Sequence, residues 1–481
     1  MSPNESRNSE KSGPVPDAVV YKPAGPGENR MTNSNKQYKN KGGKLMWAEE
    51  MAMYQIYPLG MCGAPFANDG VLEHRILKVL DWIPHLKKLG ITSVYFGPVF
   101  NSDTHGYNTR DYQKIDPRLG TNEDFAKVCA ALHKNGIRIF LDGVFNHVGR
   151  GFFGFQDVLK NRENSQYKDW FYLNFGGNDA WNDGLWYEGW EGNYDLVKLN
   201  LDNPAVCDYL IDSVKSWVRD YNIDGLRLDV AYMVNRNFLK RLRWETDQMK
   251  PAFYLIGEIL GGDYRQIMNP EMCHSVTNYE CYKGIYSSFN SMNLFEINSS
   301  LERQFGTDPW DLYPGMHLMS FVDNHDVTRI ASILTNKKHL PLAFALMCGM
   351  PGYPCVYYGS EWGIEGRKED GDQALRPAVD KPVWNGLTDY VAACLKAKTG
   401  SEALCYGGFR KVLLTNRQYI FERKSEHERV LVAINADENE YVAHFDAGCG
   451  QAVDLITGKL HDFGGGSHLA PCSAALWKCE R

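Results

Sequence analysis

From Tyr54 to about residue 400, short apolar runs alternate with longer stretches in which apolar residues recur at helical spacing. The short runs have the length and composition of strands buried on both faces of a parallel sheet. Eight strands are predicted, at Met53–Tyr57, Ser93–Pro98, Ile137–Val144, Gly225–Val230, Phe253–Ile259, Ser275–Asn278, Met319–Asp323 and Cys355–Tyr358. The stretches between them predict helices, among them Leu77–Leu89, Asn122–Lys134, Ala205–Tyr221, Arg236–Lys250 and Leu340–Met347.

Strands and helices that alternate in this way form either a closed barrel or an open doubly wound sheet. Eight such units fit the usual size of a closed barrel. No glycine-rich phosphate fingerprint follows the first strand, although an open dinucleotide-binding sheet would need one. The chain is therefore predicted to be an α/β protein built on a (β/α)8 TIM barrel.

Departures from the alternation divide the chain into domains. Segment 147–203 is dense in Gly, Asn and aromatic residues, and so long an excursion after the third strand predicts a small inserted domain. Short alternating runs predict an antiparallel C-terminal β-sandwich domain over 401–481. Residues 1–45 are polar and lack periodicity, which predicts a disordered leader. The barrel is then expected to span 46–146 and 204–400.

Aromatic side chains are concentrated in one part of the inserted segment. They are Trp170, Phe171, Tyr172, Trp181, Trp186, Tyr187 and Trp190. Such rings serve either as platforms on which sugar rings lie or as the core of the inserted domain. For most of them the core is the favoured interpretation.

Composition excludes several classes of partner. The net charge of −7 leaves no basic face for nucleic acid and no polybasic patch for a membrane surface. Apolar runs such as Leu342–Cys348 are far shorter than the roughly 20 residues that span a bilayer. The twelve cysteines lack zinc-ligand spacing and no secretory signal is found, so reduced thiols and a cytoplasmic location are expected.

Four predicted strands end in clusters of polar residues. The clusters are Asp142–His147, Arg227–Asp229, Gly257–Glu258 and Asp323–Asp326. In a (β/α)8 barrel the carboxyl ends of the strands meet on one face, where catalytic residues lie. A single cluster would more often be a satisfied structural group. Four clusters predict an active site, because each buried polar group left unsatisfied costs about 1–3 kcal/mol.

The carboxyl groups in these clusters suit the cleavage of a glycosidic bond with retention of configuration. That reaction needs one ionised and one protonated carboxyl group about 5–5.5 Å apart. Arg227 and Asp229 are two residues apart on a strand and so point to the same side, where the guanidinium would hold Asp229 ionised as the nucleophile. Glu258 ends the next strand, and burial beside another carboxylate would keep it protonated as the acid.

Three further residues are expected to bind the same sugar. Asp326 is a third carboxylate, suited to gripping hydroxyl groups and straining the ring rather than to proton transfer. His147 and His325 would donate hydrogen bonds to hydroxyl groups.

In chain order these segments resemble the signature regions of glycoside hydrolase family 13, the α-amylase family, over roughly residues 50–400. The matching segments are Asp142–His147, Gly225–Val230, Gly257–Ile259 and Phe321–Asp326, with Val197–Asn200 as an extra region, His105–Tyr107 as a loop and Tyr357–Glu361 as the eighth-strand motif. The extra region most resembles that of the neopullulanase and cyclomaltodextrinase members.

The resemblance implies roles for individual residues. It implies a (β/α)8 barrel with Asp229, Glu258 and Asp326 as the catalytic carboxylates. Tyr107 is similar to the tyrosine that stacks under the sugar at the cleavage point. Asp372 and Arg376, four residues apart, resemble a pair that binds the next sugar on the non-reducing side.

Some positions depart from the family pattern. Tyr232 and Met233 stand where α-amylases proper usually carry a Lys-His pair whose histidine carbonyl binds calcium. No cofactor is therefore expected to be required and no metal ligands are predicted, although a backbone carbonyl at this point leaves calcium possible. Asn108 stands where many relatives have Asp, and Leu260 and Gly261 follow the acid where neopullulanase-like members often have Trp and His.

The sequence therefore predicts a retaining α-glucan hydrolase that cleaves α-1,4 bonds of maltodextrins or cyclodextrins by double displacement. Its expected ligand is an α-glucan oligosaccharide, and no particular oligomeric state is predicted. One alternative is a transglycosylase or isomerase of the same family, which uses the same three carboxylates but excludes water. A more remote alternative is a non-catalytic carbohydrate-binding or transporter-accessory protein; such relatives lose the carboxylates that this chain keeps.

Overall fold

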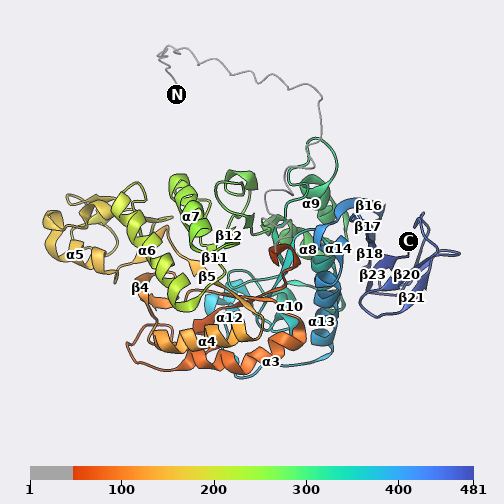
Figure 1. Ribbon diagram of the computed structural model, residues 1–481, viewed down its shortest axis with the longest axis horizontal. Helices are drawn as coiled ribbons and strands as arrows, with labels where there is room; N and C mark the ends of the chain where they lie inside the picture. The colour runs from red at the N-terminus through yellow and green to blue at the C-terminus, as the bar shows by residue number, and fades with distance from the viewer. Residues whose placement is uncertain (1–46, 481) are drawn as a thin grey trace, which may run out of the picture.

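The computed structural model describes residues 47–480, and its centre is a barrel of eight parallel strands (Figure 1). The strands are β1 (Met53–Ile56), β2 (Ser93–Phe96), β5 (Arg138–Gly143), β11 (Gly225–Leu228), β12 (Tyr254–Gly257), β13 (Ser275–Val276), β14 (Met319–Phe321) and β15 (Tyr353–Tyr357). They follow one another in the order β13, β12, β11, β5, β2, β1, β15 and β14. A parallel bridge between Thr277 and Met319 joins the two ends of this order. The predicted (β/α)8 barrel is confirmed.

Helices cover the outside of the barrel. The five that the sequence predicts are present as α3 (Val79–Leu89), α4 (Asn122–Lys134), α6 (Pro204–Tyr221), α7 (Arg236–Met249) and α11 (Leu340–Gly349). Further helices include α8 (Tyr279–Ser291), α9 (Phe295–Phe305) and α13 (Gly386–Thr399). Local signals set their ends: Thr121 and Asp124 form a capping box at the start of α4, and Gly90 ends α3 in the left-handed conformation that glycine adopts without strain.

The interior of the barrel is filled by side chains from alternate positions of its strands. Six strands contribute apolar residues to one inner cluster: Met53, Tyr95, Phe140, Ile256, Phe321 and Cys355. On β11 the inward positions are Gly225 and Arg227, and a Cβ at Gly225 would meet the Phe140 ring at 2.3 Å. The interior of the barrel is therefore filled by apolar side chains. Buried polar side chains, Arg227 among them, lie above these at the carboxyl ends of the strands.

Two loops at the carboxyl end of the barrel carry small sheets of their own. The loop after β2 forms a hairpin of β3 (Phe100–Ser102) and β4 (Thr109–Ile115). The excursion after β5 contains α5 (Phe153–Asn161) and a three-stranded sheet of β6 (His147–Gly149), β10 (Asn193–Lys198) and β9 (Gly189–Trp190). Because β6 begins at His147, the excursion places that side chain at the barrel mouth.

The C-terminal part of the chain is an antiparallel β structure. Its six-stranded sheet has the order β16 (Gly408–Leu414), β17 (Gln418–Lys424), β18 (Arg429–Asn435), β23 (Ser473–Cys479), β20 (Gln451–Asp454) and β21 (Leu460–Asp462). A separate pair, β19 (Tyr441–Ala443) and β22 (Ser467–Leu469), packs on it through Ala443 and Leu469. In Figure 1 this sheet and α5 of the excursion lie at opposite ends of the molecule. The predicted leader, 1–45, lies outside the described residues.

Candidate active site

One guanidinium group joins three carboxylates at the carboxyl ends of β5, β11 and β12. Nη1 of Arg227 donates to Asp142 Oδ1 at 2.9 Å and to Asp229 Oδ1 at 2.8 Å. Nη2 of the same side chain lies 2.5 Å from Glu258 Oε1. All four side chains are at least nine-tenths buried. The two carboxylates expected to carry the chemistry, Asp229 and Glu258, therefore lie within reach of a single cation.

The turn after Asp229 holds Glu258 in place. Val230 has a φ of 38°, a left-handed conformation that is rare and costly for a β-branched residue. In this conformation its backbone N–H donates to Glu258 Oε2 at 2.8 Å. Strain in the turn is thus coupled to the position of the second carboxyl group.

Burial sets the protonation of this cluster. It raises the pKa of Asp229 well above the ordinary value and raises the pKa of Glu258 too, while the charge of Arg227 opposes both shifts. Burial also raises the pKa of Asp142, again against Arg227. We expected Arg227 alone to keep Asp229 ionised, but one cation serves three buried carboxyl groups. One of the three groups is thereby favoured to hold a proton.

A second group of side chains lies beside this cluster. The Tyr107 hydroxyl donates to Asp142 Oδ2 at 3.1 Å and hydrogen-bonds to Nε2 of His325, whose ring stacks on that of Tyr107 at 5.6 Å. Nδ1 of His325 contacts Nε2 of Gln55 at 2.7 Å. Burial lowers the pKa of His325 to about 3, so its imidazole is neutral. The ring is thereby fixed on both sides at the mouth of the barrel.

Asp326 is paired on two sides. Its Oδ2 lies 3.0 Å from His325 Nε2, and its Oδ1 lies 2.8 Å from Arg376 Nη2. The same Arg376 nitrogen lies 3.3 Å from Asp372 Oδ2. Burial raises the pKa of Asp326, but the charges around it, those of Arg376 and Arg227 among them, outweigh burial and bring the value to about 2. Asp326 is therefore ionised, whereas one of the three carboxyl groups around Arg227 is favoured to hold a proton.

His147 points at the nucleophile candidate from the other side. Its Nε2 lies 3.9 Å from Asp229 Oδ2 and, among the described residues, has no hydrogen-bond partner. Burial lowers its pKa to about 3. A neutral, buried imidazole with a free nitrogen is suited to a hydroxyl group of a bound molecule.

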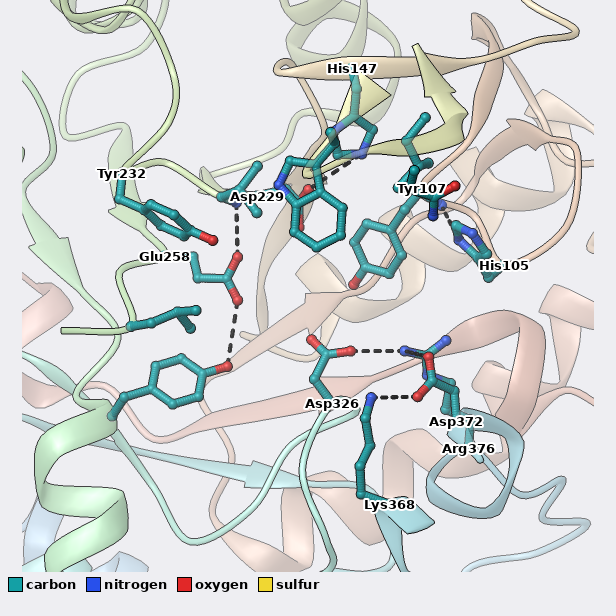
Figure 2. A pocket seen from close by; sticks show the side chains of 16 residues that line it. His105, Tyr107, His147, Asp229, Tyr232, Glu258, Asp326, Lys368, Asp372 and Arg376 are labelled. Carbon is teal, nitrogen blue, oxygen red and sulfur yellow. Dashed lines mark hydrogen bonds and ion pairs between the residues drawn. The ribbon is translucent and has the colours of Figure 1, made fainter. Parts of the chain in front are cut away.

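These side chains line one pocket of about 380 Å³. Figure 2 shows Glu258 and Tyr232 on one side, His147 on the side of the excursion, and Lys368, Asp372 and Arg376 together on another. Of the nine site residues predicted from the sequence, seven line this pocket: Tyr107, His147, Asp229, Glu258, Asp326, Asp372 and Arg376. Arg227 and His325 lie directly behind them, in contact with Asp229 and Asp326.

Comparisons with known proteins decide the family. The model described as alpha amylase, catalytic domain, matches residues 55–402. The chain belongs to the α-amylase family of glycoside hydrolases.

Individual members of the α-amylase family are similar over most of the chain. A cyclomaltodextrinase from a Bacillus species is 30% identical over 82% of this chain and 74% of its own length. Neopullulanase 2 of Thermoactinomyces vulgaris is 29% identical over 81% of this chain and 70% of its own. The structure of a cyclic α-maltosyl-(1→6)-maltose hydrolase from Arthrobacter globiformis, in complex with that cyclic sugar, superposes with a TM-score of 0.76 at 25% identity, covering 90% of this chain and 99% of the other.

Some residues of this α-amylase family pocket were missed from the sequence. The Tyr279 hydroxyl lies 3.5 Å from Glu258 Oε1 and accepts from Asn324 Nδ2 at 2.9 Å. Lys368 lines the pocket and pairs with Asp372. Tyr279 is the first residue of α8, directly after β13, so its position one strand beyond Glu258 was the available signal. Lys368 lies in a long loop after β15, where the sequence gives no such signal.

An arginine binds the loop after β11, where α-amylases proper usually bind calcium. Nη2 of Arg236 donates to the carbonyl of Tyr232 at 3.1 Å, and Nη1 donates to the carbonyls of Ala231 at 3.1 Å and Val234 at 3.0 Å. The carbonyl of Met233, at the position of the calcium-binding histidine, is not among the groups to which Arg236 donates. Among residues 47–480, no group of three or more His, Cys, Asp or Glu side chains is arranged to hold a metal ion.

No helix among the described residues is long and apolar enough to cross a membrane.

Proposed function

We propose that this chain is a retaining hydrolase that cleaves α-1,4-glucosidic bonds of maltodextrins or cyclodextrins by double displacement. The observation that carries the proposal is the pair Asp229 and Glu258, which face one pocket and share the Arg227 guanidinium. Relatives named for cyclomaltodextrin, pullulan and cyclic maltosyl-maltose support an α-glucan as the substrate.

In the first step Asp229 attacks the anomeric carbon and the bond from that carbon to the leaving oxygen breaks. Glu258 gives its proton to the leaving oxygen, and a glycosyl ester of Asp229 remains. We assign the proton to Glu258 because the first step requires a general acid beside the leaving oxygen. Asp142 accepts from Tyr95, Tyr107 and Arg227, which favours its ionised form. Arg227 contacts both Asp229 and Glu258 and favours the ionised form of each, so the assignment rests on the reaction itself and is tested by the two variants below.

In the second step Glu258, now ionised, takes a proton from water as the water oxygen attacks the anomeric carbon. The bond from that carbon to Asp229 breaks, Asp229 leaves as a carboxylate, and the sugar is released with its original configuration. Asp326 and His147 are placed to bind hydroxyl groups of the same sugar, because both point into the pocket. Tyr107 supplies a ring face for the sugar to lie on.

We also propose that the reaction takes place in the cytoplasm and needs no metal ion. The first point is supported by the twelve cysteines, all of which are unpaired and nine of which are buried. The second is supported by residues 47–480, in which no group of three or more His, Cys, Asp or Glu side chains is arranged to hold a metal ion, and by Arg236, which binds three carbonyls of the loop after β11.

Two variants test the mechanism. Asp229→Asn removes the nucleophile, and kcat is expected to fall by about 10³-fold or more. Glu258→Gln should cleave a substrate with a good leaving group only slowly, and added azide should restore turnover because it needs no general base. The rescued Glu258→Gln variant should give the α-glycosyl azide, formed from the covalent intermediate. An α-glycosyl azide from Asp229→Asn, or near-full activity of either variant, would overturn the assignment.

Two product analyses test the reaction class and the substrate. Freshly released sugar should be the α anomer by NMR, and the β anomer as first product would rule out double displacement. Incubation with maltohexaose, β-cyclodextrin, pullulan and soluble starch identifies the preferred substrate. Products longer than maltohexaose would make the enzyme a transglycosylase.

A further inference from the structure

A bulge in strand β10 connects the catalytic pocket to a second hollow. Asn193 pairs with Trp190 of β9, yet Val197 pairs with Gly189, the very next residue of β9. The residues between them have no partner in β9, as happens at β-bulges, which redirect side chains. Leu196, which pairs with Gly149 of β6, lines the catalytic pocket.

The second hollow adjoins the first at Asn193, which lines both. It has a volume of about 420 Å³, and its lining includes Trp181, Tyr194 and Asp195. A chain that leaves the catalytic pocket past Asn193 would therefore enter the hollow that Trp181, Tyr194 and Asp195 line.

The Trp181 side chain is held in place by the protein and is still open to solvent. Its ring stacks on the guanidinium of Arg150, with 4.4 Å between the guanidinium carbon and the ring centre. That guanidinium is itself fixed, because it donates to Asp183 Oδ2 at 2.5 Å and to the Tyr187 hydroxyl at 2.6 Å. Trp181 nevertheless remains 51% exposed. One face of the ring is supported by the protein, while much of the ring stays open to solvent.

The turn that carries Trp181 is tied down as well. The backbone N–H of Trp181 donates to Asp179 Oδ1 at 2.8 Å, and Asn178 Nδ2 donates to Asn182 Oδ1 at 2.6 Å. By contrast, Phe171 and Tyr187 of the same segment are buried and form its core. Trp181 is thus separated from the core aromatics and held in an exposed, pre-organised position.

We propose that Trp181 is an outer sugar-binding platform, and that the groove from the catalytic pocket over Asn193 to Trp181 holds the glucose units of a linear α-glucan beyond the cleavage site. The C–H face of a pyranose ring lies on an aromatic plane, and Asp195 supplies an acceptor for hydroxyl groups. This inference rests on the proposed function, since it takes the occupant of the catalytic pocket to be an α-glucan.

The test measures binding rather than turnover. In an Asp229→Asn background, calorimetry compares the binding of maltotriose with that of maltohexaose. The proposal expects only the longer sugar to extend from the catalytic pocket to Trp181. Trp181→Ala is expected to weaken maltohexaose binding about 3- to 10-fold and to change maltotriose binding by less than about twofold. Trp181→Phe, which keeps a ring on Arg150, should retain most of the affinity for maltohexaose.

Trp244→Ala is the matched control, because Trp244 is also an exposed tryptophan, 63% exposed, but lies on helix α7. It should bind both sugars as the parent does. Equal weakening of both sugars by Trp181→Ala would mean that the ring only supports the fold, and no weakening of either would mean that no sugar reaches it; both results overturn the proposal. Failure of the proposed function is recognised separately, as full activity of Asp229→Asn itself.

Discussion

Arg227 lies 2.5 Å from Glu258 through Nη2 while its Nη1 donates to both Asp142 and Asp229. The proposed acid and the proposed nucleophile are therefore not independent groups, because a change in the guanidinium moves the pKa of both.

Replacement of Arg227 should separate its charge from its shape. Arg227→Lys keeps a positive charge but loses the planar fork, so kcat/KM is expected to fall about 10²–10³-fold. Arg227→Gln also loses the charge that lowers the pKa of Asp229 and Glu258. The acid limb of its pH–rate profile should therefore move to higher pH than that of Arg227→Lys. Coincident acid limbs in the two variants would contradict this account.

The strained turn at Val230 predicts a local effect on Glu258. Because the Val230 N–H holds Glu258 Oε2, Val230→Pro removes one hydrogen bond to the acid. Proline cannot adopt the φ of 38° either, so both stability and kcat should fall. Val230→Gly is the control that keeps the N–H and tolerates the conformation, and its kcat should stay within about tenfold of the wild type. A larger loss in the glycine variant would show that the valine side chain matters more than the hydrogen bond.

Gly225 is the first residue of strand β11 and lies inside the barrel, two residues before Arg227. A Cβ there would lie 2.3 Å from the Phe140 ring and 2.4 Å from the Tyr254 carbonyl oxygen. Gly225→Ala should therefore cost about 1–3 kcal/mol in the free energy of unfolding, measured by urea denaturation. Gly450→Ala is the control, since a Cβ at Gly450 meets no atom within 4 Å, and its effect should stay within about 0.5 kcal/mol. Equal effects of the two changes would mean that Phe140 and the backbone at Tyr254 move aside at little cost in free energy.

The barrel and its carboxylates could both be predicted from one sequence pattern, a short apolar run that ends in a polar residue. A buried parallel strand is an unbroken apolar run, so the polar residue that ends it, such as Asp229 or Glu258, stands out. Parallel strands end on the same face, which brings these side chains together without further information. Seven of the eight predicted strands run longer than the observed ones, and the predicted eighth strand is one residue shorter than β15. On β11 the excess is Asp229 and Val230, which already belong to the turn over the site.

The remaining site residues depend on contacts that no local pattern records. Tyr279 reaches Glu258 only because the bridge between Thr277 and Met319 closes the barrel beside it. Arg236 looked like an ordinary first residue of a helix, yet it turns back onto the carbonyls of the preceding loop. The aromatics at 170–190 were indistinguishable in sequence, and only packing separates the buried Tyr187 from the exposed Trp181.

The loop after β11 predicts how the enzyme responds to chelators and to loss of Arg236. Among the described residues no group of three or more His, Cys, Asp or Glu side chains is arranged to hold a metal ion, so EDTA should leave kcat/KM unchanged. Arg236 binds the carbonyls of Ala231, Tyr232 and Val234. Arg236→Met leaves these carbonyls without their donor, which should cost about 1–3 kcal/mol in stability. Arg236→Lys should recover only part of that loss, since an ammonium group lacks the planar fork. Loss of activity in EDTA that added calcium restores would show that a metal ion does support the wild-type enzyme.

Lys398 predicts a pH dependence of stability that is separate from catalysis. It is buried on α13, where its Nζ donates to the carbonyls of Leu404 at 2.5 Å and Met350 at 3.4 Å. Burial, helped by the charge of Arg423, lowers the pKa of Lys398 from its ordinary value to about 7. Between about pH 7 and the ordinary lysine pKa near 10.4, the unfolded chain therefore binds a proton that the folded chain lacks.

With that sign, the free energy of unfolding rises with pH across this window, by up to about 1.4 kcal/mol per pH unit from this one group. Below pH 7 both states are charged and the slope disappears. Lys398→Met should abolish the slope in urea unfolding experiments between pH 7 and 9, whereas Lys396→Met, at an exposed position of the same helix, should leave it unchanged. If the Lys398→Met variant kept the wild-type slope, the proton would have to be bound elsewhere, and Lys398 would be charged in the folded protein throughout this range.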